Sequence, residues 1–483
     1  MAGMSPGSAE PDTSQGQVLP ELGRRAQRRF RVQLRRRLVV GAFVVAFFLT
    51  SGLVSGPASI PLASPSPAEP SGGSGGPAAL PGLLATPRPW PSWVTAEVSG
   101  PTATRWGNVA QASSTLLLSS GYRGWRAQPP AAVLAGAGDG PAEPASLAAE
   151  VRGIYLTAYT AGKPEAFRTL LNLVEETALN AMVINIKDEQ GRATYDTSVA
   201  AFRDINAVSV QISDIEGLLR LTEAYGVYTI GRLVTFQDST LSSHNPGLAV
   251  KRPDGALWRD DNGRAWTDPF QTEVWDYNLA LAEEAASLGF DEIQFDYVRF
   301  PTDGDTRNMI LSRPSGPDNI NRVRAITEFL NYARERLAPY GCLVSADVFG
   351  IICSTRVDTS LGQVLEDIAG AVDYVSPMIY PSHYGPGHFG LPEPDAAPYW
   401  TIRGALSDAL ERLGPEGKAK LRPWLQDFTL YNRYGPEQVL DQIRATHELG
   451  IKGWMLWSPS NVYTTAALRA YTVNLDAYLG GDG

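Results

Sequence analysis

The chain has 483 residues, with 41 basic and 51 acidic side chains, a formal net charge of −10 and 43% hydrophobic residues. This length allows one large domain or two to three ordinary ones, and the hydrophobic content is enough for a substantial core. The acidic balance argues against a nucleic-acid-binding protein, which needs a basic face.

The N-terminal segment has the pattern of a membrane anchor. Eight arginines lie within residues 24–37, and the uncharged apolar run LVVGAFVVAFFLTSGLV follows at 38–54. A spanning helix needs about 17–25 such residues, and preceding arginines keep the N-terminus in the cytoplasm. We expect a cytoplasmic basic segment at 1–37, a single-pass anchor in the cell membrane at 38–54, and an extracytoplasmic main domain. A signal peptide cleaved near GPAS (56–59), with secretion of the remainder, is the alternative.

Residues 55–150 are rich in Pro, Ala, Gly and Ser, as in PLASPSPAEPSGGSGGPAALPG. Such a stretch buries too little apolar surface to offset its chain entropy, so we expect a flexible linker.

From residue 151 onward, short apolar β-branched segments alternate with amphipathic helical patterns, which are clearest at 164–178, 271–289, 321–338 and 435–450. The segments with strand character are 152–158, 181–187, 227–234, 292–298, 342–349, 372–380, 422–428 and 453–459. Eight strand–helix units in series predict an α/β fold, a (β/α)8 TIM barrel spanning 151–483. A doubly wound open sheet is the rival, but no GxGxxG turn follows the first strand.

Of the two cysteines, Cys342 opens the predicted strand at 342–349 and Cys353 lies beyond its far end. That separation is too great for a disulfide. The chain has no zinc-type spacing or phosphate-binding loop, and we expect no cofactor and no resident metal.

Polar side chains gather at the carboxyl ends of the predicted strands. Because side chains alternate along a strand, the segment at 292–298 directs one set outward and the other into the barrel. The outward set is Ile293, Phe295 and Tyr297, and the inward set is Glu292, Gln294 and Asp296. Active sites of TIM barrels lie at the carboxyl end, where Asp296 is placed. The same alternation directs further polar and aromatic residues inward: Asn185, Lys187, Arg232, Asp347, Tyr380, Trp424, Gln426 and Trp457. Burying this many polar side chains inside a barrel costs free energy, so the arrangement indicates a functional site.

Asp296 and Asp347 come from adjacent strands and form a candidate catalytic pair. Glycoside hydrolases commonly use two carboxyl groups that flank the glycosidic bond. One acts as the proton donor and the other as the nucleophile or base. Arg232 or Arg299 beside Asp296 would favour its ionised form, whereas Asp347, with less compensation, would keep its proton longer. Asp296 is therefore predicted to be the nucleophile or base, and Asp347 the acid.

Aromatic and polar residues around this pair are candidates for sugar binding, since aromatic rings suit the apolar faces of sugars. The predicted substrate-binding residues are Lys187, Asp188, Arg232, Trp258, Trp266, Arg299, Tyr380, His383, Gln426, Asp427 and Trp457. The structural alternative for any single buried aspartate is a loop cap or a bond to backbone amides.

An insertion at 235–270 is much longer than an ordinary strand-to-helix connection of about 2–6 residues. Its turn signals, PDG (253–255) and DNG (261–263), predict a hairpin that places Trp258 and Trp266 on a flap over the mouth. A structural excursion with its own small core is the alternative.

His383 and His388, in SHYGPGHFG (382–390), could ligate a metal. Their spacing is not that of HExxH, and the intervening glycines and proline give no set geometry. A metal-dependent hydrolase is therefore a minor alternative.

Seven motifs resemble, in order, a bacterial glycoside hydrolase family first catalogued as a domain of unknown function. They are VRGIYLTAYTAG, INIKDEQGRATYDT, GFDEIQFDYVRFP, VSADVFG, YVSPMIYPSHYGPG, RPWLQDF and GWMLWSPSN, and they cover roughly residues 150–475. The resemblance implies a TIM barrel of the glycosidase superfamily, with a catalytic aspartate after the fourth strand, at Asp296. Several related families have a glutamate after the fifth strand, where this chain has Asp347.

Taken together, the sequence predicts a membrane-anchored extracytoplasmic glycoside hydrolase. Its expected partners are a polysaccharide or oligosaccharide substrate and, through the N-terminal helix, the cytoplasmic membrane. A carbohydrate-binding barrel without catalysis is the main alternative from another class.

Overall fold

The computed structural model of the chain describes residues 148–475. The predicted cytoplasmic segment at 1–37, the anchor at 38–54 and nearly all of the predicted linker at 55–150 lie outside the described residues. Within 148–475, no helix is both long and apolar enough to cross a membrane.

Eight parallel strands close into a barrel, as the alternation of strand and helix patterns predicted. β1 pairs with β2 on one side and with β10 on the other, which completes the ring β1-β10-β9-β8-β7-β6-β5-β2. The barrel strands are β1 (Arg152–Leu156), β2 (Ala181–Lys187), β5 (Tyr228–Val234), β6 (Glu292–Asp296), β7 (Leu343–Phe349), β8 (Tyr374–Met378), β9 (Trp424–Gln426) and β10 (Trp454–Trp457). Each lies within one of the eight predicted segments.

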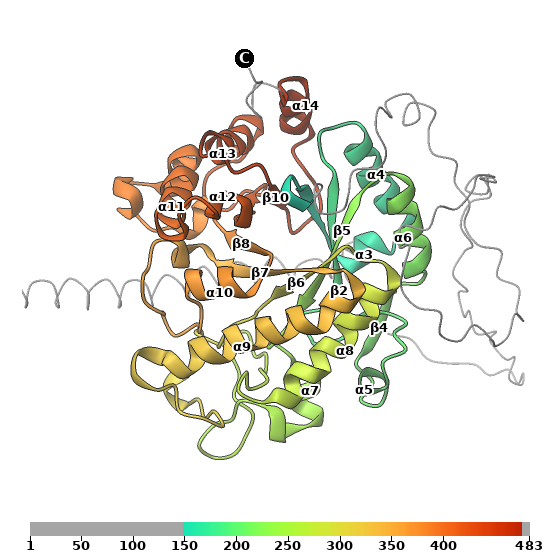
Figure 1. Cartoon of the computed structure of the whole chain (residues 1–483), viewed down its shortest axis with the longest axis vertical. Helices are drawn as coiled ribbons and strands as arrows, with labels where there is room; N and C mark the ends of the chain where they lie inside the picture. The colour runs from blue at the N-terminus through green and yellow to red at the C-terminus, as the bar shows by residue number, and fades with distance from the viewer. Residues whose placement is uncertain (1–147, 476–483) are drawn as a thin grey trace, which may run out of the picture.

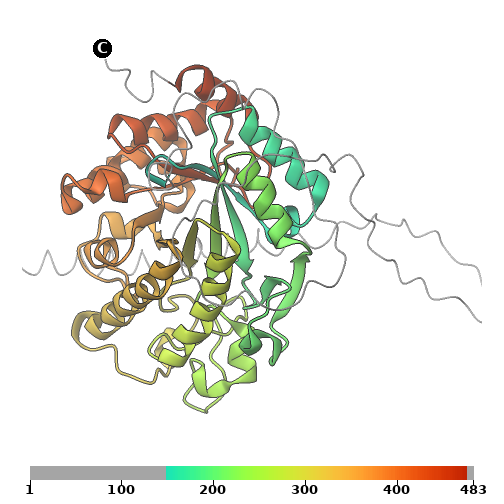
Figure 2. The ribbon, with the colours of Figure 1, turned by 45° about the vertical axis from the view of Figure 1, so that its right-hand side comes forward.

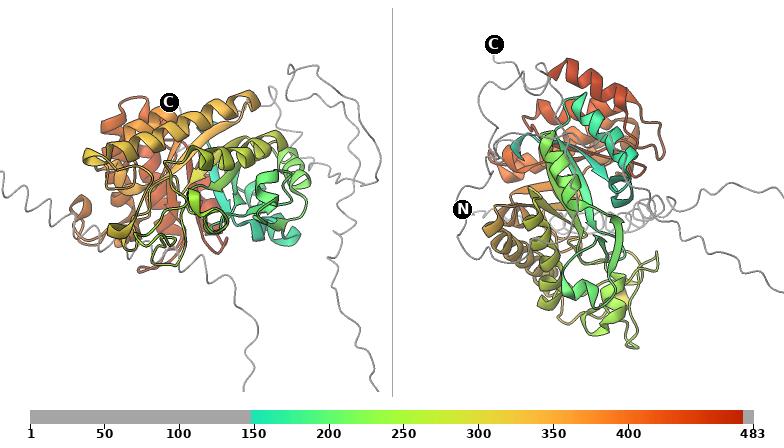
Figure 3. Two further views of the ribbon diagram at one scale, coloured as in Figure 1. Left: turned by 90° about the horizontal axis from the view of Figure 1, so that it is seen from below. Right: turned by 90° about the vertical axis from the view of Figure 1, so that its right-hand side faces the viewer.

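Helices surround the strands, as Figure 1 and the rotated views of Figures 2 and 3 show. They are α3 (Ala158–Ala161), α4 (Pro164–Glu175), α5 (Ala200–Arg203), α6 (Ile215–Ala224), α7 (Ser239–His244), α8 (Thr272–Leu288), α9 (Ile320–Leu337), α10 (Leu365–Ala371), α11 (Pro398–Leu413), α12 (Gly417–Lys420), α13 (Pro436–Glu448) and α14 (Thr465–Val473). Local signals set several boundaries. Pro164 and Pro436 occupy the first turns of α4 and α13, and Gly289 ends α8 with a left-handed φ of 111°.

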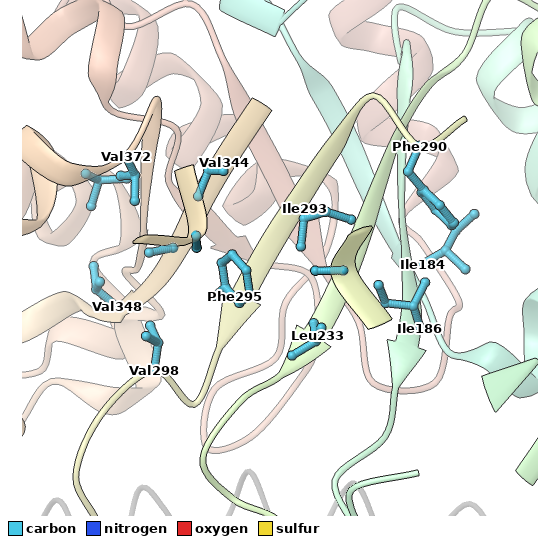
Figure 4. Close-up of a cluster of buried hydrophobic side chains, with 14 of the residues drawn as sticks. Ile184, Ile186, Leu233, Phe290, Ile293, Phe295, Val298, Val344, Val348 and Val372 are labelled. Carbon is cyan, nitrogen blue, oxygen red and sulfur yellow. The ribbon is translucent and has the colours of Figure 1, made fainter. Parts of the chain in front are cut away.

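The hydrophobic core lies between the strands and the surrounding helices. Ile293 and Phe295 of β6 and Val344 of β7 belong to this layer and are fully buried (Figure 4). Phe295 meets Phe329 of α9 edge to face, with ring centroids 5.2 Å apart. The outward face predicted for 292–298 is therefore confirmed for Ile293 and Phe295.

The inside of the barrel is polar at its amino-terminal end as well. Glu292 of β6 forms a buried ion pair with Arg422 and accepts hydrogen bonds from Ser345 of β7 and Tyr228 of β5. Ala148 is fully buried in the interior cluster, and its carbonyl accepts a bond from Arg422. The folded unit therefore includes residues just before 151.

A short excursion follows β2 that the sequence did not indicate. β3 (Ala193–Tyr195) pairs antiparallel with β2 at Lys187↔Ala193, and β4 (Val208–Ile212) pairs parallel with β3. Both cysteines are free and buried, as their spacing predicted.

Candidate active site

Asp296 lies at the carboxyl end of β6 and is held by Arg232 of β5. Arg232 donates to Asp296 Oδ2 through Nε at 2.9 Å and through Nη2 at 2.5 Å. The other carboxylate oxygen, Oδ1, accepts the backbone N–H of Tyr297 at 2.6 Å. Asp296 is 6% exposed and Arg232 is 1% exposed, so this charge-assisted fork operates in a largely water-excluded setting.

Arg232 connects Asp296 to a second strand and a second carboxylate. Its Nη1 donates to Asn185 Oδ1 at 2.7 Å and to Glu189 Oε1 at 3.1 Å. Asn185 in turn donates to the Tyr155 hydroxyl at 3.0 Å. With these bonds every nitrogen of the guanidinium is occupied, which fixes its orientation toward Asp296.

Aromatic rings flank the same guanidinium. Tyr155 and Trp457 stack with centroids 4.0 Å apart, and the Arg232 guanidinium carbon lies 5.5 Å and 5.3 Å from their ring centres. Trp424 meets Trp457 edge to face at 5.4 Å. Of the aromatic residues in the prediction, Trp424 and Trp457 therefore lie in the barrel interior close to Arg232.

Asp347 lies on β7, the strand next to Asp296, and is bonded differently. Its Oδ1 accepts the indole N–H of Trp424 at 2.6 Å, and the residue is only 2% exposed. Burial, and then the negative charge of Asp296, raise the pKa of Asp347 well above its usual range, and Arg232 compensates only in part. The two carboxyl groups therefore have opposite environments, one tied to a cation and one favoured in its neutral form.

Two further predicted residues approach the pair from the end of β8. Burial, followed by the charges of Asp347 and Asp296, raises the pKa of the Tyr380 hydroxyl. The His383 ring meets the Tyr380 ring edge to face at 5.2 Å, and burial lowers the pKa of His383 to about 4. His383 is therefore a neutral imidazole at the pH values where most enzymes work.

The backbone just after Asp296 is strained. Tyr297 has a φ of +50°, a left-handed conformation that a bulky aromatic residue rarely adopts. This turn brings the Tyr297 amide back onto Asp296 Oδ1. Such outliers cluster at functional sites because the surrounding structure must hold them in place.

The prediction that Lys187 points into the barrel is wrong. A register shift between Asn185 and Lys187 interrupts the pairing of β2 with β5, so the alternation is lost at that point. Lys187 turns outward instead and is fully buried, with Nζ 2.7 Å from Asp238 and 2.9 Å from Asn278 of α8. Asp188 accepts the backbone N–H groups of residues 190 and 192, which makes it a loop cap rather than a mouth residue.

The tryptophans of the insertion do not form an open flap. Trp258 and Trp266 are 1% and 0% exposed, and their indole N–H groups donate to the Asp305 carbonyl and to Asp260. The insertion is therefore the excursion with its own small core, because burying both indoles is more favourable than leaving them over the mouth. Asp296 is bonded to Arg232 and not to Arg299. The guanidinium carbon of Arg299 instead lies 4.8 Å from the centre of the Trp266 ring.

Two predicted residues at the end of β9 are engaged by the protein itself. The side chain of Gln426 accepts from Ser382 and donates to the Phe428 carbonyl. Both oxygens of Asp427 are bonded to Thr464, so this carboxylate secures the loop after β10.

The structure brings no metal-binding set together within 148–475, where no group of three His, Cys, Asp or Glu side chains is arranged to hold an ion. His383 Nδ1 pairs with Ser382, and His388 Nδ1 pairs with the Gly385 carbonyl.

One residue of the site was left out of the prediction. Tyr155 faces the barrel interior, as does Trp424, which the alternation had directed inward. Glu189, just beyond the predicted strand at 181–187, bonds to Arg232 from the loop after β2. Applying the same alternation to β1 would have placed Tyr155 at the mouth. The strand pattern places Glu189 at the end of β2, but its bond to Arg232 depends on the register shift in that strand.

Comparisons with known proteins show the family to which the chain belongs. The model of a family described as "Putative glycosyl hydrolase domain" matches residues 153–463. Among curated proteins, no sequence matches the chain significantly. A hypothetical protein from Ruminiclostridium thermocellum ATCC 27405 is 39% identical over 40% of this chain and 97% of its own, with a TM-score of 0.37.

The PgaB (BpsB) glycoside hydrolase domain from Bordetella bronchiseptica is similar in fold. It has a TM-score of 0.51 at 15% identity and covers 67% of this chain and 98% of its own. The family match covers most of the chain, including every barrel strand apart from the first residue of β1. The chain is therefore a member of this glycosyl hydrolase family, and its barrel is that of a glycosidase.

Proposed function

We propose that the protein cleaves a polysaccharide by means of the carboxyl groups of Asp296 and Asp347. The supporting observation is the contrast between them: one is tied to Arg232, and the pKa of the other is raised by burial and by its neighbour. Glycoside hydrolysis needs one charged and one protonated carboxyl group at the same time.

In this mechanism Asp347 donates its proton to the glycosidic oxygen as the bond to the anomeric carbon breaks. Asp296 then either attacks that carbon or takes a proton from an attacking water. Arg232 holds the Asp296 carboxylate in place through two bonds, so it is oriented before substrate arrives. The stereochemistry of the product, followed by NMR during hydrolysis, distinguishes the two roles: retention indicates a nucleophile and inversion a base.

Asp296→Asn and Asp347→Asn variants test the pair. Each is expected to lower kcat on a cleaved polysaccharide by about a thousandfold or more, since each removes a group that acts in the transition state. Glu284→Gln is the matched control, because Glu284 lies on α8 and, within 148–475, its side chain bonds only to Tyr195, Thr197 and Ser198 of the β3 excursion. A polysaccharide cleaved equally well by wild type and Asp296→Asn would exclude this mechanism.

The proposal also includes an extracytoplasmic position, with residues 38–54 as the anchor. The run of arginines before an apolar segment supports it. Extraction of membranes at alkaline pH should leave the full chain in the membrane pellet and release a chain lacking residues 1–54. Recovery of a shortened chain, cut near residues 56–59, in the soluble fraction would favour the cleaved signal peptide.

A further inference from the structure

A second group of residues, two arginines and two aromatic residues, lies beside the carboxylate pair and has no role in the mechanism above. It consists of Arg264, Trp266, Tyr297 and Arg299, here called the rim cluster. Arg264 and Trp266 come from the insertion after β5, and Tyr297 and Arg299 follow β6 directly after Asp296.

The insertion reaches the mouth because it extends the barrel pairing. Trp266 forms a β-bridge with Gln237, just beyond β5, and the Thr267 amide donates to the Phe236 carbonyl. Residues two apart on such a segment face the same way, so Arg264 accompanies Trp266 toward Tyr297. The Trp266 and Tyr297 rings lie 5.8 Å apart.

Arg264 is a nearly buried cation without a partner. It is 8% exposed, and its guanidinium makes no hydrogen bond or ion pair with any residue of 148–475. Burial and the charge of Asp296 raise the pKa of Tyr297, whereas Arg264 lowers it. The guanidinium and the Asp296 carboxylate therefore both lie near the Tyr297 hydroxyl, which itself has no hydrogen-bond partner within the described residues.

Arg299 is held in place by aromatic rings. Its guanidinium carbon lies 4.8 Å from the centre of Trp266 and 4.7 Å from that of Phe349, and the residue is 6% exposed. One nitrogen, Nη1, donates to the Phe300 carbonyl, but Nε and Nη2 bond to nothing in 148–475. Stacking of this kind covers the faces of a guanidinium and leaves its edge free to donate.

The neighbouring acids do not neutralise these arginines. Asp260 is occupied by the indole of Trp266 and by backbone amides of its own turn. Asp303 lies near Arg299, but no ion pair joins them within the described residues, and burial raises the pKa of Asp303, which favours its neutral form. A buried cation is normally paired, so an unpaired one beside a binding mouth marks a place for a ligand's charge.

We propose that the rim cluster binds an anionic group of the substrate, a carboxylate, phosphate or sulfate on the sugar next to the bond that is cleaved. The inference rests on the proposed function for the location of the cleaved bond. Arg264 and Arg299 would donate from their free edges, and the Tyr297 hydroxyl would add a third donor. The chain carries a net charge of −10, so an acidic polymer needs a local cationic site of this kind to bind.

Thermal unfolding of the purified full chain with small anions tests this directly. D-glucuronate represents a carboxylate, inorganic phosphate and inorganic sulfate represent the other two classes, and D-glucose is the neutral reference. All are added at constant ionic strength. At least one anion is expected to raise the Tm by on the order of 2 °C where D-glucose does not. A rise with glucuronate alone indicates a uronic acid, and a rise with phosphate or sulfate alone indicates a substituted sugar.

Arg264→Gln should abolish that rise, with affinity lower by about tenfold to a hundredfold. Arg259→Gln is the matched control, because Arg259 is an exposed arginine of the same insertion that donates to the Gly263 carbonyl. Without anion, Arg264→Gln is expected to be at least as stable as wild type, whereas a purely structural arginine would lower the Tm when removed.

The absence of a rise with any anion, or a rise that persists in Arg264→Gln, would overturn the anionic-substrate proposal. These measurements need no cleavage, so they are independent of the carboxylate mechanism. If anions bind as expected but Asp296→Asn still cleaves the polysaccharide, the catalytic proposal is wrong and the anion-binding proposal is supported. If the carboxylate variants are inactive but no anion binds, only the rim proposal fails.

Discussion

At the scale of single residues, the site depends on how each carboxyl group is bonded. Asp296 and Asp347 occupy adjacent strands and similar depths, with exposed fractions of 6% and 2%. They differ because Arg232 donates twice to Asp296, whereas Asp347 receives one bond, from the neutral indole of Trp424. Because their burial is similar, the bond to Arg232 is what distinguishes the environments of the two carboxyl groups.

Asp347→Asn should stabilise the fold at neutral pH. Because the pKa of Asp347 is raised in the folded state above an unfolded value of about 3.9, the carboxyl group's contribution to stability falls as pH rises from about 4. The asparagine cannot ionise, and its Oδ1 can still accept from Trp424. We expect a gain of at least about 1 kcal/mol at pH 7 that disappears near pH 4, measured by urea unfolding. A loss of stability at every pH would mean that Asp347 is not a neutral buried acid.

Tyr297 provides a second residue-scale prediction, because its φ of +50° favours glycine over any residue with a Cβ. Both Tyr297→Gly and Tyr297→Ala lose the ring, so their difference isolates the backbone. The glycine variant is expected to be more stable than the alanine variant by about 0.5–1 kcal/mol, the reverse of the usual order. Equal unfolding free energies for the two variants would show that the turn relaxes and holds no strain.

At the scale of elements, one irregularity in β2 decides which side chains reach the mouth. The register shift at Asn185–Lys187 sends Asn185 inward to Arg232 and Lys187 outward to α8. It also starts the loop from which Glu189 reaches Arg232. Bulges at barrel rims commonly re-aim side chains in this way.

The buried pair of Lys187 and Asp238 secures this bulge, since their charged atoms lie 2.7 Å apart and both are essentially unexposed. Lys187→Met should therefore lower the free energy of unfolding by about 3–5 kcal/mol, because it strands a buried carboxylate. Adding Asp238→Asn removes that charge while keeping the cap on the Leu241 amide, and should restore at least about 1 kcal/mol. If the double variant is no more stable than the single one in urea, the charge pair is not the reason for the loss.

At the scale of the whole molecule, the barrel has two polar ends that differ in how their side chains are bonded. The amino-terminal end is closed by Glu292, Arg422 and Tyr228, all bonded to one another or to their neighbours, with Ala148 over them. At the carboxyl-terminal end, by contrast, Arg264 and Arg299 carry donors that no residue of 148–475 accepts, and these donors are the basis of the proposed anion site.

Residues before β1 cover the amino-terminal end of the barrel, and this predicts where a stable fragment must begin. Ala148 and Val151 are both fully buried, and the Val151 carbonyl accepts the amide of Trp454. A fragment beginning at 152 should be less stable than one beginning at 148 by about 2 kcal/mol, from the lost apolar burial. Coincident urea transitions of the two fragments would show that these residues do not contribute to the barrel.

The sequence by itself determined the barrel, its eight strands, and the positions of Asp296 and Asp347, because these follow from local periodicity: alternation along a strand, apolar helix faces, and proline and glycine at helix ends. Only the tertiary structure decided which arginine pairs with Asp296, where Lys187 points, and that the indoles of the insertion are buried. Those outcomes depend on a register shift between β2 and β5 and on contacts across the barrel, which join residues that are distant along the chain. Local sequence patterns do not determine which of several possible partners a side chain bonds to. The rim cluster likewise depends on contacts between the insertion and the residues after β6.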